Sequence, residues 1–178
     1  MGEIRSTMDI IMEKTKNLTM SEEEKAEFNR KALHGKVNGL VQKFLDDLIS
    51  LPSIKLEMGS EKKKHPAQAE ELLKGELMER LEPDSNNEKV FQLMEEILGI
   101  DTKPFKRVMT EFQEKVAKER ALKVEGLRKK LAERGISGPA VVPNPDLDET
   151  WIQFYKESKR ACKERLAIMP DSQTTGSQ

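Results

Sequence analysis

Apolar side chains recur every three or four residues along most of this chain, which is the spacing of one face of an α-helix. We therefore predict an all-α fold: a helical hairpin or bundle with one long central helix, an extended proline-rich connection and a disordered C-terminal tail. The expected organisation is N-terminal amphipathic helices over 1–50, a linker over 51–66, a helical region over 67–168 and a tail over 169–178.

Two capping patterns predict the helices of the N-terminal region. Ser6 with Asp9 opens a short amphipathic helix, and Ser21 with Glu24 opens a longer one that runs to Ile49. In such a capping box, the serine hydroxyl and the acidic side chain each accept a hydrogen bond from a free backbone amide. The apolar stripe of the longer helix contains Leu33, Val37, Leu40, Val41, Phe44, Leu45 and Leu48.

Gly35 and Gly39 lie inside this longer helix, where each costs about 1 kcal/mol relative to alanine. One interpretation is the close approach of another helix to a patch without side chains. The other is a break, with Gly35 ending one helix and Asn38 capping the next. We favour the break.

The segment 50–66 contains Pro52, Gly59, Pro66 and a run of lysines, which together indicate a linker. The alternation of Ile54, Leu56 and Met58 within it leaves a short strand as an alternative, with only Val141-Val142 as a candidate partner.

Beyond the linker, we expect helices over 67–81 and from a capping box at Ser85-Asn86-Asn87-Glu88 to Gly99. The longest helix spans 103–134 and stops at Gly135, where a left-handed backbone conformation brings Ile136 back over Leu131. After a proline-punctuated connection, Asp146 with Glu149 caps a final helix over 147–168. Its apolar side contains Leu147, Trp151, Phe154, Tyr155, Ser158, Cys162 and Leu166.

The helix 103–134 carries the candidate interface of the chain. Its apolar seam steps by four or three residues and is interrupted once, by Arg120. Because a buried arginine needs a carboxylate, Arg120 should either reach the edge of the seam or meet an acidic residue of 70–96. The candidate interface residues are Phe105, Met109, Phe112, Val116, Arg120, Leu127 and Leu131.

The same helix is basic, with eleven Lys and Arg against six Asp and Glu over 101–135, which raises nucleic-acid binding as an alternative function. Its basic residues, however, are spread around the whole circumference. In four places a glutamate stands four residues before a lysine, an arrangement that stabilises a helix in water. With an overall pI near 6.2, the pattern disfavours nucleic acid as the partner.

The residues predict no catalytic, cofactor-binding or metal-binding site. The two histidines, His34 and His65, lie in different segments without any metal-ligand spacing, and Cys162 is far from both in sequence. Asp46 and Asp47 diverge by about 100° as neighbours in a helix, which is typical of a solvated face. We expect no cofactor and no enzyme activity.

The chain has no window of about 18 apolar residues and no export-signal pattern at its N-terminus, so we expect no membrane contact. Gly2 followed by Ser6 matches the loose pattern for N-myristoylation, an interpretation that we disfavour. A single cysteine fits a reducing compartment. The predicted localisation is cytoplasmic.

The string Leu131-Ala132-Glu133-Arg134-Gly135-Ile136-Ser137-Gly138, followed by Ala140-Val141-Val142-Pro143-Asn144, resembles a segment of small uncharacterised bacterial helical proteins. Those proteins also open with a short helix and an acidic-capped second one. The resemblance covers the two ends of the chain and implies a bacterial cytoplasmic protein with no particular activity.

Several amphipathic stripes and one long charged helix need facing surfaces that a chain with 4% aromatic residues does not readily supply alone. We therefore expect an interaction or scaffold protein that binds a protein partner or a second copy. The alternatives are nucleic-acid binding through 103–134 and an accessory subunit of an enzyme. Retention on heparin, a concentration-dependent mass and neighbouring genes discriminate among them.

Overall fold

The computed structural model describes residues 21–169, which form six α-helices and one short 3-10 helix, with no strand in that range. The expected helix that begins near Ser6, the Gly2 pattern and the tail after residue 169 lie outside the described residues. The elements are α2 (Glu22–Leu45), α3 (Leu51–Lys64), α4 (Pro66–Glu79), α5 (Glu88–Leu98), α6 (Lys103–Glu133), η1 (Pro145–Leu147) and α7 (Glu149–Ala167). The predicted all-α class is confirmed.

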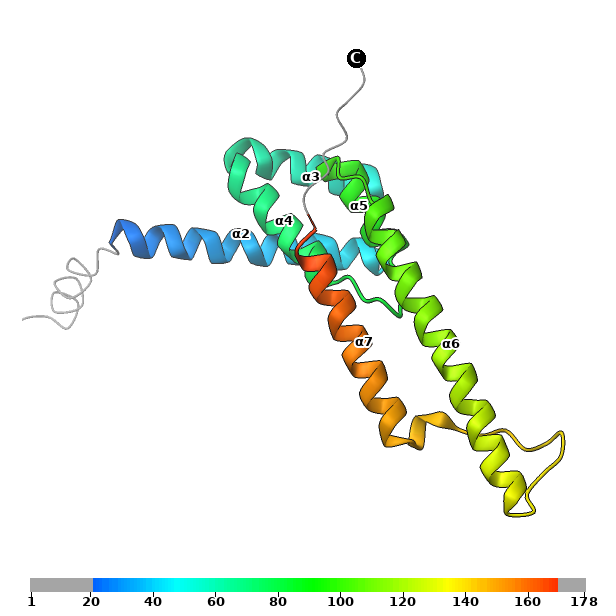
Figure 1. Ribbon diagram of the computed structural model, residues 1–178. Coiled ribbons are helices and arrows are strands. Elements are labelled where there is room, and N and C mark those ends of the chain that lie inside the picture. The colour runs from blue at the N-terminus through cyan, green and yellow to red at the C-terminus, as the bar shows by residue number, and fades with distance from the viewer. Residues whose placement is uncertain (1–20, 170–178) are drawn as a thin grey trace, which may run out of the picture.

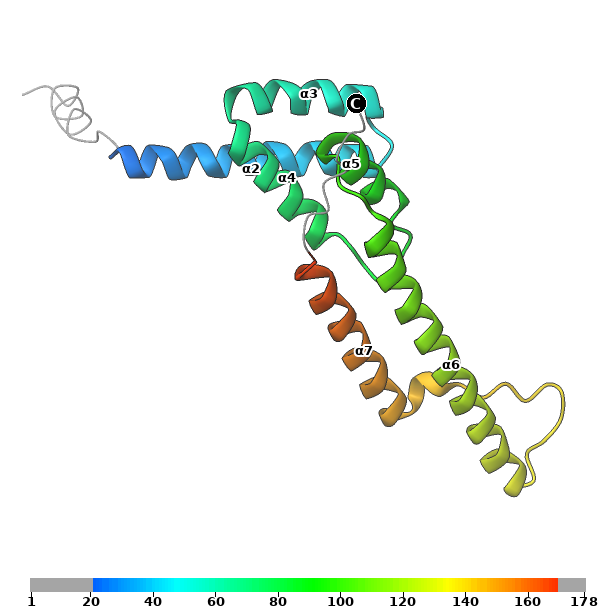
Figure 2. The same ribbon diagram turned by 45° about the horizontal axis from the view of Figure 1, so that its top comes forward.

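Helices α2 to α5 pack into a head, and α6 and α7 form an antiparallel hairpin that projects from it (Figure 1). The first half of α2 also leaves the head, on the other side of the molecule, as a second view confirms (Figure 2). The hydrophobic core is continuous from the head into the base of the hairpin. Its fully buried members include Val37, Val41, Ile54, Met58, Leu73, Leu77 and Leu93.

Helix α2 begins with the predicted capping box. The Glu24 amide donates to the Ser21 hydroxyl at 3.1 Å, and the Ser21 amide donates to the Glu24 carboxylate at 2.8 Å. Its buried face is the predicted one, except that Leu48 lies beyond the helix and is 71% exposed.

The predicted break at Gly35 and Gly39 is wrong, because α2 runs unbroken through both glycines. The alternative, close approach of another helix, is also wrong: a Cβ atom built at either position would have no heavy atom of another helix within 4 Å. Packing does not explain the two glycines.

The predicted linker over 51–66 is wrong as well, because α3 fills most of it. The Ser50 hydroxyl caps the helix by accepting from the Ser53 amide at 3.4 Å, and Pro52 lies in the first turn, where its missing amide costs nothing. Ile54 and Met58, one helical turn apart, are completely buried. Leu56 is 78% exposed, so the alternation that allowed a strand has no structural counterpart.

Helices α4 and α5 lie close to their predicted positions, and α5 ends at Gly99 with the expected left-handed conformation, φ 66°. The capping box predicted at its start is absent. Instead the buried Asn87 side chain binds the Glu82 backbone, accepting from its amide at 3.1 Å and donating to its carbonyl at 2.8 Å. Asn87 thereby fixes the loop between α4 and α5.

The 31-residue α6 ends as predicted. Gly135 has φ 77°, its amide donates to the Ala132 carbonyl, and the Ile136 amide donates to the Leu131 carbonyl, both at 2.9 Å. Helix α7 starts two residues later than expected, and its cap is Asp148 rather than Asp146. Leu147 belongs to η1 and is 82% exposed, so its predicted place on the buried side is wrong.

Candidate protein interface at the hairpin tip

The apolar seam predicted on α6 is buried near the head and only half-buried toward the other end of the helix. Near the head, Phe105, Met109 and Phe112 are buried in the core. Phe112 also packs against Tyr155 of α7, with ring centroids 6.2 Å apart. This first part of the candidate interface therefore holds the hairpin to the head.

A polar cluster fastens α7 to the loop between α4 and α5. Glu82 accepts from Lys159 at 2.9 Å and from Lys163, while Asp84 accepts from Tyr155 and from Lys159 at 3.0 Å. Hydrogen bonds from Lys163 and Lys159 hold the pKa of the Glu82 carboxyl below its ordinary value. A hydrogen bond from the Tyr155 hydroxyl likewise lowers the pKa of the Asp84 carboxyl. The Glu82 and Asp84 carboxylates in turn raise the pKa of Lys159. All five side chains find their partners within the cluster, which therefore attaches α7 to the loop between α4 and α5.

Farther along α6, Arg120 interrupts the apolar seam. Its side chain is exposed at the edge of the seam, which was one of the two predicted positions. Its guanidinium donates to Asp146 at 3.0 Å and lies 5.8 Å from the Trp151 ring centroid. The alternative partner, an acidic residue of 70–96, is wrong, because the carboxylate comes from η1. Lys123 then pairs with Asp148 at 2.7 Å, which joins the start of α7 to α6. Hydrogen bonding from Lys123 lowers the pKa of Asp148.

Beyond Lys123, α6 continues for ten residues that α7 does not reach, a length of about 15 Å. The connection 134–148 turns back along this end of α6 (Figure 1), and its Pro143 and Pro145 are buried. The apolar seam nevertheless stays partly open, since Val124, Leu127 and Leu131 are only half-buried.

The connection that follows this end of α6 carries exposed apolar side chains as well. Val142 is 84% exposed, Leu147 82% and Ile136 50%. We call this surface the hairpin tip; it consists of Val124, Leu127, Leu131, Ile136, Val141, Val142 and Leu147. The predicted interface residues Leu127 and Leu131 belong to it, whereas Val116 lies farther in and packs against the core.

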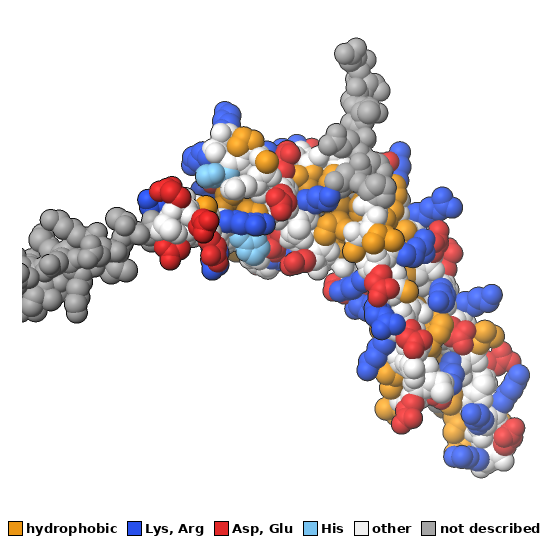
Figure 3. All heavy atoms as spheres, turned by 60° about the vertical axis from the view of Figure 1, so that its left-hand side comes forward, with side chains coloured by type: hydrophobic (Ala, Val, Ile, Leu, Met, Phe, Trp, Pro, Cys, Tyr) orange, Lys and Arg blue, Asp and Glu red, His pale blue; other side chains and the backbone are white. Residues whose placement is uncertain are grey.

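Basic side chains outnumber acidic ones at this end of α6: Arg128, Lys129, Lys130 and Arg134 are exposed, and so are Glu125 and Glu133. Of the four predicted Glu–Lys pairs on α6, the structure forms Glu125–Lys129, at 2.9 Å. The mixed charges along the hairpin are visible in Figure 3, where blue and red side chains alternate toward its end. The tip therefore combines open apolar side chains with an excess of basic ones, which we call its basic rim.

The other candidate groups remain apart from this surface. His34 is exposed on α2 with its Nε2 3.7 Å from the Glu76 carboxylate, and His65 is half-buried between α3 and α4. Cys162 is buried, as predicted, with its Sγ 4.0 Å from the Val108 carbonyl oxygen; burial raises its thiol pKa. Asp46 and Asp47 are exposed.

Within residues 21–169 no three His, Cys, Asp or Glu side chains are placed to hold a metal ion together. In the same range every buried side-chain nitrogen or oxygen has a hydrogen-bond partner. No helix between residues 21 and 169 is long and apolar enough to cross a membrane.

Sequence reasoning missed the part of the tip that the connection supplies. Ile136, Val142 and Leu147 stand among glycines and prolines, outside any helical period. The signal in the sequence was that these large apolar residues lie in a connection between helices, where few side chains can be buried in a core.

Comparison of the chain with protein-family models, with curated proteins and with solved structures gave no match. The resemblance to small bacterial helical proteins thus stays a prediction. A proposal for the function has to rest on the geometry of the chain itself.

Proposed function

We propose that this chain is a non-catalytic interaction or scaffold protein that docks a protein partner on the hairpin tip. One observation carries the proposal: the apolar seam of α6 extends past the start of α7 and remains half-open. Removing apolar surface from water contributes about 25 cal/mol per Å², so a complex in which another protein covers the tip is stabilised by this burial. The head and the base of the hairpin supply the rigid support for that surface.

The composition of the tip also fits a protein better than a nucleic acid. A phosphate backbone binds Lys and Arg but leaves exposed side chains such as Val142 and Leu147 in water. A protein partner covers the apolar centre and meets the basic rim with its own carboxylates, which is the ordinary anatomy of an interface.

An enzyme role has less support from the described residues. The polar cluster of Glu82, Asp84, Tyr155 and Lys159 pairs off internally and joins two segments of the chain. The thiol of Cys162 is enclosed by α6 and α7 rather than presented in an electropositive cleft.

A photo-crosslinking amino acid at position 142 tests the proposal in the native cell. We expect it to form a discrete crosslinked product with a protein, and we expect Ile136→Glu in the same chain to abolish that product. The matched control is position 56 on α3, because Leu56 is 78% exposed, close to the 84% of Val142, and belongs to the head. Equal crosslinking at both positions, or a product that ignores Ile136→Glu, would contradict the proposal.

A further inference from the structure

The side of α2 that faces away from the head is uncovered within residues 21–169. Phe28 and Val37 are nine residues apart on this helix, about two and a half turns, so their side chains point to opposite sides. Val37 is completely buried in the head, whereas Phe28 is 63% exposed. Ala32 and Gly35, which follow Phe28 at helical spacing, are exposed as well. We call this strip the outer face of α2; it consists of Phe28, Ala32, Gly35 and Gly39.

The two glycines of α2 make the outer face shallow. Gly35 and Gly39 stand about two and three turns after Phe28, on the same side of the helix. A Cβ atom built at either position would have no heavy atom of another helix within 4 Å, so the side chains of a neighbouring segment have room there. Because Ala32 belongs to the same strip, an alanine at position 35 leaves most of that room. The exposed Phe28 ring is the part of the face that gains most from being covered.

The twenty residues that precede Ser21 have the period and the length to cover the outer face. Their apolar residues recur at the spacing of one helix face: Ile4, Met8, Ile11 and Met12. As a helix, 4–18 would span about 21 Å, and 22–35 of α2 spans about 20 Å. Ser21 is the N-cap of α2, so this segment is joined directly to the start of that helix.

Charge does not select the occupant of the outer face, but the covalent connection does. Residues 1–20 contain three acidic and three basic side chains. In the first turns of α2, Glu22 pairs with Lys25 at 2.8 Å and Glu27 with Lys31 at 2.7 Å. A segment tethered by a short turn has an effective concentration in the millimolar range, about a thousandfold above a second copy at about 1 μM. The tether therefore favours the chain's own N-terminal segment.

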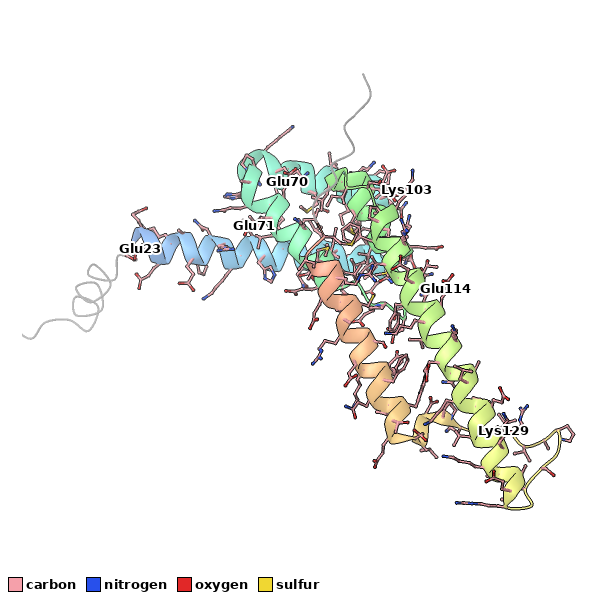
Figure 4. The ribbon with its side chains drawn as sticks, viewed as in Figure 1. Glu23, Glu70, Glu71, Lys103, Glu114 and Lys129 are labelled. Carbon is pink, nitrogen blue, oxygen red and sulfur yellow. The ribbon has the colours of Figure 1, made fainter. Side chains whose placement is uncertain are left out.

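We infer that residues 4–18 fold back antiparallel along the outer face of α2. A turn at 19–20 places Met12 level with Phe28 and Met8 level with Ala32, so the chain itself covers the exposed aromatic ring. This inference goes beyond the proposed function and does not rest on it. Figure 4 shows Glu23, at the start of α2, and Lys129, at the hairpin tip, at opposite ends of the molecule.

A pair of introduced cysteines in the full-length chain tests the fold-back. One variant combines Met8→Cys with Ala32→Cys, and the matched control combines Met8→Cys with Ala26→Cys. Ala26 is also an exposed alanine of α2, but it lies about 160° around the helix from Phe28. On oxidation of dilute protein, the intrachain 8–32 disulfide should form at least about tenfold faster than 8–26, because the bond requires Cα atoms within about 7 Å. Peptide mass spectrometry identifies the bond, and the native Cys162 is buried.

A second substitution in the 8–32 variant shows whether the Phe28 contact drives the fold-back. Phe28→Asp should slow the disulfide several-fold, because it places a charge in the apolar contact, whereas Ala26→Asp should not. Circular dichroism verifies that each variant is folded.

Equal disulfide rates at 26 and 32, or a rate that ignores Phe28→Asp, would overturn the inference. Disulfide-linked dimers in place of the intrachain product would assign the outer face to a second copy, and absence of any 8–32 disulfide would assign it to no segment of this chain. Either result would also overturn the inference. The crosslink at position 142 reports on the hairpin tip alone, so failure of the proposed function is recognised separately.

Discussion

The cost of truncating side chains should fall steeply along the seam of α6, from the head toward the tip. Phe112 is 6% exposed and packs against Tyr155, so Phe112→Ala should lower the free energy of unfolding by about 3 kcal/mol, the lower end of the usual range for Phe, since half-buried Tyr155 can relax into the space. Val116 and Leu131 are half-buried, and their truncation to Ala removes less enclosed apolar surface. We expect about 1 kcal/mol for each.

Urea unfolding followed by circular dichroism at 222 nm measures all three variants on dilute protein, where self-association contributes least. Trp151 fluorescence, from within the hairpin, provides a second probe. A cost at Leu131 as large as that at Phe112 would show that the tip is already packed within the chain. A cost below about 1 kcal/mol at Phe112 would refute its role in joining the hairpin to the head.

Four further predictions concern other parts of the fold. Gly35→Ala should raise the free energy of unfolding by about 0.5–1 kcal/mol in the same urea assay, because the new methyl group meets open space in an unbroken helix; a destabilised variant would contradict the geometry of α2. Trp151, 5% exposed, should emit at a blue-shifted wavelength that moves red in denaturant, and a water-like native emission maximum would count against its burial. Cys162 should react with a thiol reagent slowly until the protein unfolds, whereas rapid labelling of the native protein would show an accessible thiol. Because the Glu82 and Asp84 carboxyls have lowered pKa values, their contribution to stability is present above the ordinary values of 4.5 and 3.8 and is lost as pH falls through the native-state values. Glu82→Gln should therefore be less stable than wild type at pH 7 and lose less on acidification; an unchanged pH profile would mean that the cluster does not hold α7.

Local rules predicted those features whose cause lies within a few residues. The capping box of Ser21 with Glu24 and the helix stops at Gly99 and Gly135 each depend on a hydrogen bond or a backbone angle that one short stretch determines. The burial of Cys162 followed in the same way from the period of one helix face.

The errors arose where tertiary packing outweighed local preference. Pro52 and Gly59 suggested a linker, but burial of Ile54 and Met58 against α2 and α4 stabilises a helix across both breakers. The seam of α6 predicted an interface without revealing which part the chain itself covers. That division depends on where α7 begins, at Glu149, and on the return of the connection along α6.

Whether a protein covers the hairpin tip can be measured as the accessibility of position 142 in the cell. The measurement compares the rate of thiol alkylation of a Val142→Cys variant in intact native cells with its rate in dilute purified protein. Leu56→Cys corrects for reagent entry, and wild-type Cys162 is buried. We expect the Val142→Cys rate, relative to Leu56→Cys, to be several times lower in the cell. An equal relative rate in both settings would mean that the tip stays in solvent, and would contradict the account.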